Sequence, residues 1–461
     1  MRFKTSFLIT LLFHLTIIVV DKGAGFVIVG LLKDNENLKG ALDLLTNVPP
    51  ILMAVSNLGL AASLVFFTRR KEVSVRVAGE TTSLVALVWG GTIALLAFFV
   101  IYVWAYFDPK TDMLEPSLLI PLLLTPPFLL LISYRNSIQL VLGRIYGYNV
   151  VHLVPSLTYL PAFLLIYFVL TDRDAKSAGV WGRFVPAVCL AVGLAWSLRR
   201  YVPLRPRFHG KFFKRALSFG WRANINSALT ILNHRLDIYY VWALYIVPGA
   251  ASLSAEDLSD AIKSQVAYYS LAVTLGELIW HFPEAMRDLL FSKVAGSSEA
   301  EAREVTPVIC RNSLLICAAG AVVIWFIHGP IIGYWFGTAW YERWALVVTP
   351  SLAWLLPGTV FFTIAKILQA DLMARHYVHT CIALTATVFV TMTVADVFLV
   401  PHYGAVGAAI GSTIGYVCSA VASLIVYVKS TGLPLRDLVL VRREDWEHYS
   451  GVLDRLRRRK S

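Results

Sequence analysis

Apolar residues run along the chain in long segments that are separated by short polar connections. A helix needs about 20 mostly apolar residues to cross the hydrocarbon core of a bilayer, which is about 30 Å thick. Windows of this kind predict twelve membrane-spanning helices. They cover residues 6–32, 44–67, 82–107, 117–142, 148–170, 179–198, 216–247, 265–292, 305–336, 345–370, 378–400 and 404–428.

The composition supports this pattern. Of the 461 residues, 57% are apolar and only 15% are charged, and the mean hydropathy is +0.66. Soluble domains carry about 25% charged residues. The connections between the predicted spans are too short to form a soluble domain. The sequence therefore predicts an all-α, polytopic membrane protein.

Lysine and arginine are unevenly distributed between the two sides of the predicted membrane. The cluster at 69–71, the seven residues between Arg199 and Arg215, and the cluster at 457–460 all fall on one side. Short loops rich in these residues stay in the cytoplasm. Both termini are thus predicted to be cytoplasmic. Membrane topology explains the net charge of +12, and no nucleic-acid partner is expected.

Two halves of the chain echo one another. Pro127 matches Pro357 and Gln139 matches Gln369 at an offset of 230, and the second span matches the eighth at an offset near 225. This repeat predicts two six-helix lobes related by a pseudo-twofold axis along the membrane normal, with a cavity between them. The predicted parts are the N-lobe 1–200, a basic linker 201–215, the C-lobe 216–430 and a basic tail 431–461.

The seventh span carries a polar stripe. At about 100° per residue, its members fall within roughly 80° of one another. They are Arg222, Asn226, Thr230, Asn233 and Asp237. Arginines and asparagines suit a diphosphate and sugar hydroxyls. Arg235 lies on nearly the opposite face, so we expect Asn233 and Asp237, and not Arg235, to line an outward exit.

The eighth span carries a more acidic stripe, with Pro283 as a possible kink among its members. These are Ser270, Thr274, Glu277, His281, Glu284 and Asp288. A charge at the bilayer centre costs at least about 2.5 kcal/mol, so the stripe must face protein or water. Two interpretations stay open. The carboxylates pair with Arg222, Arg287 or Arg311 for packing, or they exchange H+ or Na+ during transport.

The first lobe offers fewer charged candidates. Lys22 and Arg135 are the basic residues placed near its predicted cavity, although Asp21 and Lys22 could equally form a neutralised pair. In the last span, glycines repeat at close spacing from Gly404 to Gly415, which favours close helix packing.

Enzymatic motifs are absent. There is no phosphate-binding loop of the G-x-x-x-x-G-K-[ST] type, and the five cysteines show no metal-ligand spacing. No extramembrane segment is large enough for the paired carboxylates of a glycosyltransferase. The sequence predicts neither an enzyme nor a metal site.

Four further stretches of the chain are informative when taken together. They are FKRALSFGWRANINSALTILNHRLDIYYVWAL (213–244), YYSLAVTLGELIWHFPEAMRDLLFSKVA (268–295), VPHYGAVGAAIGSTIGYVCSAV (400–421) and NLGLAASLVFFTRRKE (57–72). They resemble the polysaccharide flippase branch of the multidrug/oligosaccharidyl-lipid/polysaccharide exporter superfamily, and the resemblance extends over nearly the whole chain.

The resemblance implies a multi-pass protein of the bacterial cytoplasmic membrane that flips an undecaprenyl-diphosphate-linked oligosaccharide for lipopolysaccharide or exopolysaccharide biosynthesis. By position, the diphosphate would be bound by Arg222, Arg287 and Arg311, with Lys22 and Arg135 from the other lobe. The acidic eighth span departs from a uniformly cationic cavity. A monomer surrounded by membrane lipids is expected, and other polysaccharide-assembly proteins stay open as partners.

Two alternatives remain. One is an ion-coupled drug or metabolite exporter of the same fold, and the other is a membrane glycosyltransferase or polymerase.

Overall fold

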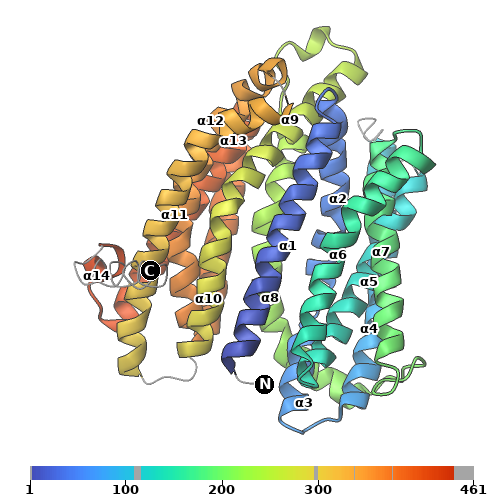
Figure 1. Cartoon of the computed structure of the whole chain (residues 1–461), viewed down its shortest axis with the longest axis vertical. Helices are drawn as coiled ribbons and strands as arrows, with labels where there is room; N and C mark the ends of the chain where they lie inside the picture. Colours follow the sequence, from blue (N-terminus) through green and yellow to red (C-terminus); the bar gives the residue numbers. More distant parts are fainter. Residues whose placement is uncertain (1–2, 108–115, 295–298, 337, 376, 441–461) are drawn as a thin grey trace, which may run out of the picture. The chain divides into compact units, whose positions relative to one another are not determined.

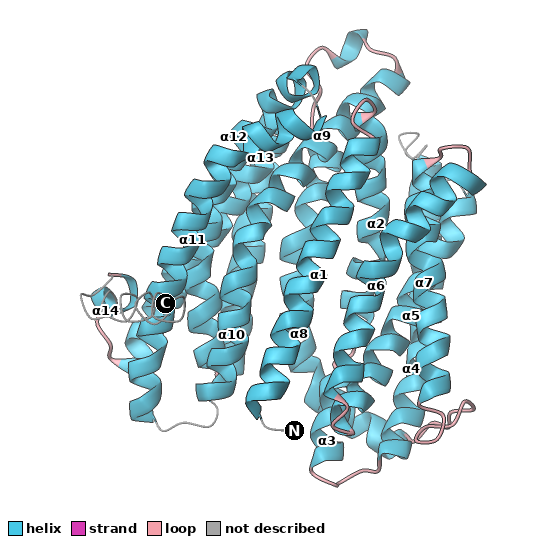
Figure 2. Ribbon diagram, viewed as in Figure 1, coloured by secondary structure: helices cyan, strands magenta, loops and turns pink. Residues whose placement is uncertain are grey.

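The computed structural model describes residues 3–107, 116–294, 299–336, 338–375 and 377–440. Every regular element among them is helical (Figures 1 and 2). Within this described part of the chain, nine helices are long and apolar enough to cross a membrane. Large apolar side chains such as Leu95, Phe99 and Val169 are exposed, as expected for a surface that faces lipid. The predicted all-α, polytopic membrane protein is confirmed.

Internal contacts divide the chain into two units, Met1–Ser270 and Leu271–Ser461. The predicted division into lobes 1–200 and 216–430, with a cavity between them, stays a prediction.

The helices of the first unit follow the predicted spans, with an additional break in the second. They are α1 (Phe3–Leu31), α2 (Glu36–Ser56), α3 (Leu60–Arg69), α4 (Val75–Phe107), α5 (Pro116–Val141), α6 (Ile145–Leu165), α7 (Ala175–Ser197), α8 (Gly210–Leu244) and α9 (Ala255–Glu277), whose last residues belong to the second unit. The seventh span, in α8, is too polar to be among the nine apolar helices.

The second predicted span is two helices, because the chain leaves the helical path at residues 57–59. Gly59 has a φ of +69°, a left-handed conformation that glycine adopts without strain. The Asn57 side chain accepts a hydrogen bond from the Gly59 amide at 3.2 Å, and the Trp89 indole donates to the Ser56 carbonyl at 3.1 Å. These contacts satisfy backbone groups that the break leaves without a helical partner.

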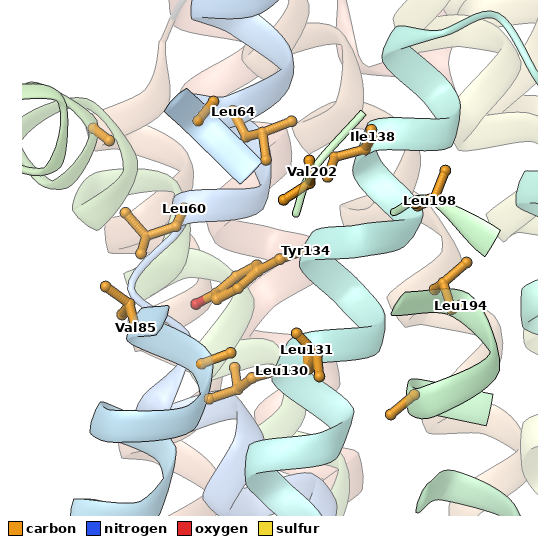
Figure 3. Close-up of a cluster of buried hydrophobic side chains, with 14 of the residues drawn as sticks. Leu60, Leu64, Val85, Leu130, Leu131, Tyr134, Ile138, Leu194, Leu198 and Val202 are labelled. Carbon is orange, nitrogen blue, oxygen red and sulfur yellow. The ribbon is translucent and has the colours of Figure 1, made fainter. Parts of the chain in front are cut away.

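The main apolar core of the first unit joins α3, α4, α5 and α7 (Figure 3). Tyr134 and Leu130 of α5 pack there against Leu60 and Val85, all of them buried. The core extends beyond the end of α7 and includes Val202 of the predicted linker, which is fully buried. The linker is therefore part of the folded unit and not a loose connection.

After the end of α9, the described part of the second unit contains four longer helices and one short α-helix. They are α10 (His281–Val294), α11 (Glu299–Phe336), α12 (Thr338–Ala374), α13 (Val378–Thr431) and the short α14 (Leu435–Val439).

The element α13 contains both of the last two predicted spans, joined by a sharp turn at Gly404 (φ 55°, ψ −127°). A Cβ atom at Gly407 would lie 2.6 Å from the Leu399 carbonyl oxygen, and one at Gly411 would lie 2.0 Å from the Asp396 side chain. The two halves therefore run antiparallel in direct contact, and the predicted close-packing role of these glycines is confirmed.

A stability test follows from the break in the second span. A Cβ atom at Gly59 would lie 2.1 Å from the Gly220 carbonyl oxygen, whereas one at Gly143, with a similar φ of +72°, meets nothing within 4 Å. A left-handed alanine costs about 1 to 2 kcal/mol by itself. We expect Gly143→Ala to lower the melting temperature in detergent modestly and Gly59→Ala to lower it several degrees further. Equal losses would contradict the close approach of the two backbones.

Candidate transport site

The eighth predicted span is interrupted. The helix α9 ends at Glu277, a single 3-10 turn covers Leu278–Trp280, and α10 begins at His281. Pro283 accounts for the break, because its ring would clash with the carbonyl of Ile279 four residues earlier in a continuous helix. That carbonyl instead accepts a hydrogen bond from the Cys317 thiol at 3.7 Å. The acidic residues expected on one continuous stripe are thus divided between two helices.

The interruption has a counterpart in the first unit. An offset of about 225 residues places Asn57, where the second span breaks, opposite Phe282, two residues beyond the turn Leu278–Trp280. Interrupted helices at corresponding positions of two repeats are typical of substrate and ion sites in transporters. The polar groups beside the two breaks are therefore the first candidates for a substrate or ion site.

A buried lysine lies against the break in the second unit. Lys366 of α12 is only 8% exposed, and its Nζ atom lies 2.9 Å from a carboxylate oxygen of Glu284. The same Nζ lies 4.1 Å from the ring centroid of Trp280 and 5.5 Å from that of Phe362. Phe362 in turn stacks on Tyr416 of α13 at 4.6 Å. The ammonium group is thus held by one carboxylate and by the faces of two rings, which attract cations.

This arrangement bears on the acidic candidates of the eighth span. Glu284 makes an ion pair, as the packing interpretation requires, and its partner at 2.9 Å is Lys366, which the sequence did not single out. Glu277 and His281 flank the 3-10 turn and are half-buried, and Arg287 follows Glu284 on the same helix. The side chain of Asp288 lies outside the described residues. The structure thus brings Glu277, His281 and Glu284 to the break.

The polar stripe of the seventh span lies on α8. Asn233 and Asp237 are both buried, and Asn226 is half-buried. Asp237 accepts a hydrogen bond from the Tyr269 hydroxyl of α9 at 2.5 Å and another from the Ile238 amide at 2.8 Å. The side chain of Arg222 lies outside the described residues. Asp237 therefore joins two helices of the first unit, and its predicted place at an exit stays a prediction.

A second polar cluster, missed in the sequence, joins α2 to α9. Lys39 forms an ion pair with Asp43 one turn later, and the Ser270 hydroxyl donates to the same carboxylate. A Cβ atom at Gly40 would lie 1.8 Å from the Lys263 carbonyl oxygen, so the two backbones touch. The hydropathy window that begins at residue 44 leaves Lys39 and Asp43 outside the span. The sequence signal for this pair is the separation of four residues between Lys39 and Asp43, which places both side chains on one face of a helix that begins at Glu36.

The remaining basic candidates are dispersed. Arg135 is 2% exposed and donates to the Ser83 hydroxyl at 2.9 Å and to the Val202 carbonyl at 3.2 Å. Arg311 is buried and donates to the Asp437 carbonyl at 2.5 Å, which ties α14 to α11. Lys22 is half-buried on α1. Arg135 and Arg311 are thus each engaged within their own unit, and a role for them in diphosphate binding stays a prediction.

No cluster of three or more histidine, cysteine or acidic side chains that could hold a metal ion occurs among the described residues.

Several solved structures share this arrangement of helices, and three of them are described as follows. One described as "Lipid II flippase MurJ, inward closed conformation" has a TM-score of 0.68 and 14% identity, over 93% of this chain and 89% of the other. An inward-facing multidrug resistance MATE family transporter of the MOP superfamily has a TM-score of 0.67 and 14% identity, over 92% and 98%. The chain shares the fold of these two proteins.

A MOP superfamily transporter from Pyrococcus furiosus shares the MOP fold as well, with a TM-score of 0.56 and 13% identity over 94% of this chain and 95% of the other. No protein-family model and no curated protein matches the sequence. The fold expected from the resemblance is confirmed.

The Lys366–Glu284 pair generates a prediction about stability. Removing one partner of a buried ion pair costs about 3 to 5 kcal/mol when it leaves a buried charge behind. Because Lys366 is buried while the Glu284 side chain is 41% exposed, we expect Glu284→Gln to be more destabilising than Lys366→Met. The double variant should recover most of the loss. The free energy of unfolding, from SDS titration in mixed micelles, tests this, and purely additive losses would show that the two side chains are not coupled.

Proposed function

We propose that this chain is a flippase that moves an undecaprenyl-diphosphate-linked oligosaccharide across the bacterial cytoplasmic membrane by alternating access, for surface polysaccharide biosynthesis. The observation that carries the proposal is the pair of interrupted helices, at 57–59 and Leu278–Trp280, in corresponding repeats of a MOP fold. The similarity to a lipid II flippase over 93% of the chain supports a lipid-linked substrate.

The chemistry of the substrate assigns different roles to different side chains. A diphosphate needs guanidinium or ammonium donors, which form strong charge-assisted hydrogen bonds. In this proposal Arg222 and Arg287 are the first candidates. Asn226, Asn233 and Asp237 suit the hydroxyl groups of sugars. Lys366 becomes available to a phosphate only if its ion pair with Glu284 opens.

Coupling to an ion gradient is part of the proposal. Glu277, His281 and Glu284 lie at the break in the eighth span, and Asp288 follows one turn later on α10. Glu284 is paired with Lys366, so binding of H+ or Na+ at this carboxylate would weaken its hold on the buried ammonium group. A cation and a phosphate would then act together, since one takes Glu284 while the other takes Lys366.

An ion-coupled exporter of a drug or metabolite is the alternative. It is favoured by the similarity to MATE transporters, which reaches a TM-score of 0.67. The aromatic side chains of Trp280, Phe362 and Tyr416 beside the break would also suit a cationic, ring-containing compound.

Translocation of a labelled lipid-linked oligosaccharide in proteoliposomes tests the flippase directly. We expect the label to reach the far leaflet only when the full chain is present, and deletion in cells to accumulate the precursor on the inner leaflet. Arg222→Ala should weaken binding roughly tenfold or more, because a charge-assisted hydrogen bond is lost. Arg235→Ala, on nearly the opposite helical face, is the matched control. Normal precursor export in the deletion strain, together with drug efflux by the chain, would support the alternative.

Ion coupling is tested in the same proteoliposomes with defined H+ and Na+ gradients. We expect Glu277→Gln and Asp288→Asn each to abolish gradient-driven transport without lowering the melting temperature. Glu256→Gln is the matched control, since Glu256 is exposed in the first turn of α9. Unchanged transport in both variants would leave these carboxylates with a packing role only.

A further inference from the structure

One end of the first unit carries an excess of exposed positive charge. It includes four lysines and arginines in residues 69–76, Arg144, and seven in residues 199–215, and all twelve of these side chains are exposed. Two carboxylates accompany these cations, Glu72 within residues 69–76 and the buried Glu80 one turn later on α4. We call this surface the basic face.

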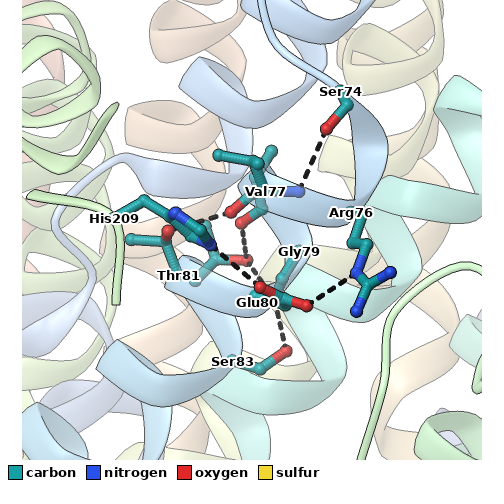
Figure 4. A network of polar contacts seen from close by, with 10 residues as sticks. Ser74, Arg76, Val77, Gly79, Glu80, Thr81, Ser83 and His209 are labelled. Atoms are coloured by element: carbon teal, nitrogen blue, oxygen red, sulfur yellow. Dashed lines mark hydrogen bonds and ion pairs between the residues drawn. The ribbon is translucent and has the colours of Figure 1, made fainter. Parts of the chain in front are cut away.

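The two carboxylates of the basic face are used to hold the linker in place. Glu80 is buried on α4 and contacts His209 at 2.9 Å and Arg76 at 3.0 Å (Figure 4). Glu72 contacts Arg215 at 2.5 Å. The buried Val202 side chain and the hydrogen bond from Arg135 to its carbonyl add a third attachment. The linker thus has a fixed path, and its cations project from an ordered backbone.

Most of the linker cations are not used inside the protein. Within the described residues, Arg200, Arg205, Arg207, Lys211 and Lys214 make no ion pair, so the face has charge to offer to an anion.

Other arginines of the face contact aromatic rings. The Cζ atom of Arg199 lies 4.0 Å from the Trp196 ring centroid, and that of Arg144 lies 5.1 Å from the Tyr201 centroid, while Arg144 also donates to the Tyr201 hydroxyl at 3.0 Å. These contacts order the two guanidinium groups.

The exposed apolar neighbours indicate what kind of anion fits. Tyr201, Leu204 and Phe208 are exposed between the cations of the linker. The linker directly follows α7, whose exposed Val192 and Trp196 side chains continue the apolar surface that faces lipid. Aromatic and basic side chains together at the end of a membrane helix are typical of the headgroup region of a bilayer. Binding of a soluble acidic protein would not require exposed apolar side chains just beyond the end of a membrane helix.

We propose that the basic face is a binding surface for the phosphate headgroups of anionic phospholipids. The clamped linker presents its unpaired cations to the phosphates, while Tyr201, Leu204 and Phe208 enter the headgroup region beside them. This role is separate from transport of the oligosaccharide and does not depend on it.

The test uses the purified full chain in neutral detergent, titrated with short-chain phosphatidylglycerol and with phosphatidylcholine of the same chain length. We expect at least about tenfold tighter binding of phosphatidylglycerol, since each cation near a lipid surface contributes about a factor of five. The combined variant Arg205→Gln, Arg207→Gln and Lys211→Gln should lose this preference and keep the melting temperature of the wild type.

The matched control is the combined variant Lys33→Gln, Arg173→Gln and Lys176→Gln, which removes the same charge on the opposite side of the predicted membrane and should keep the preference. Three outcomes would overturn the proposal. They are a wild type without preference, a preference that survives in the linker variant, and displacement of the phospholipid by geranyl diphosphate or by an acidic peptide at lower concentration. The last would assign the face to a diphosphate substrate or to a protein partner.

Discussion

A charged group inside an apolar helix bundle needs a partner in the same bundle, and this requirement organises both units. Lys366 is compensated by Glu284 and two aromatic rings, and Asp371 by Arg375 at 2.9 Å. Arg135 is satisfied by a hydroxyl and a carbonyl group. Since the desolvation of an ion in this environment costs several kcal/mol, each of these contacts constrains which helices can be neighbours.

Backbone groups at the two helix breaks also need partners, as the charged side chains do. Amide and carbonyl groups cannot be left without partners in an apolar medium. At the first break the side chains of Asn57 and Trp89 supply the missing hydrogen bonds, and at the second the Cys317 thiol does so. The breaks are therefore stable features of the fold.

Much of the fold could be predicted from hydropathy alone, because most of the spans are long and strongly apolar. The breaks could not be predicted in detail, since a window of about 20 residues averages over a turn of three. The same averaging placed the start of the second span after Asp43 and so left Lys39 and Asp43 in a loop. For the candidate site, helical spacing placed Glu284 on a polar stripe, but its partner Lys366 is 82 residues away. Pairing across such a distance depends on which helices pack together, and no local pattern contains that information.

The hairpin of α13 has a consequence for how the protein is made. Its two halves are joined at Gly404 without a loop, and their backbones touch through Gly407 and Gly411. Because no loop separates the two halves, neither half can move from the translocation machinery into lipid before the other. The last two spans must therefore enter the bilayer together, as one preassembled pair. Bulky side chains at Gly407 or Gly411 would therefore impair insertion into the membrane, before the protein binds any substrate.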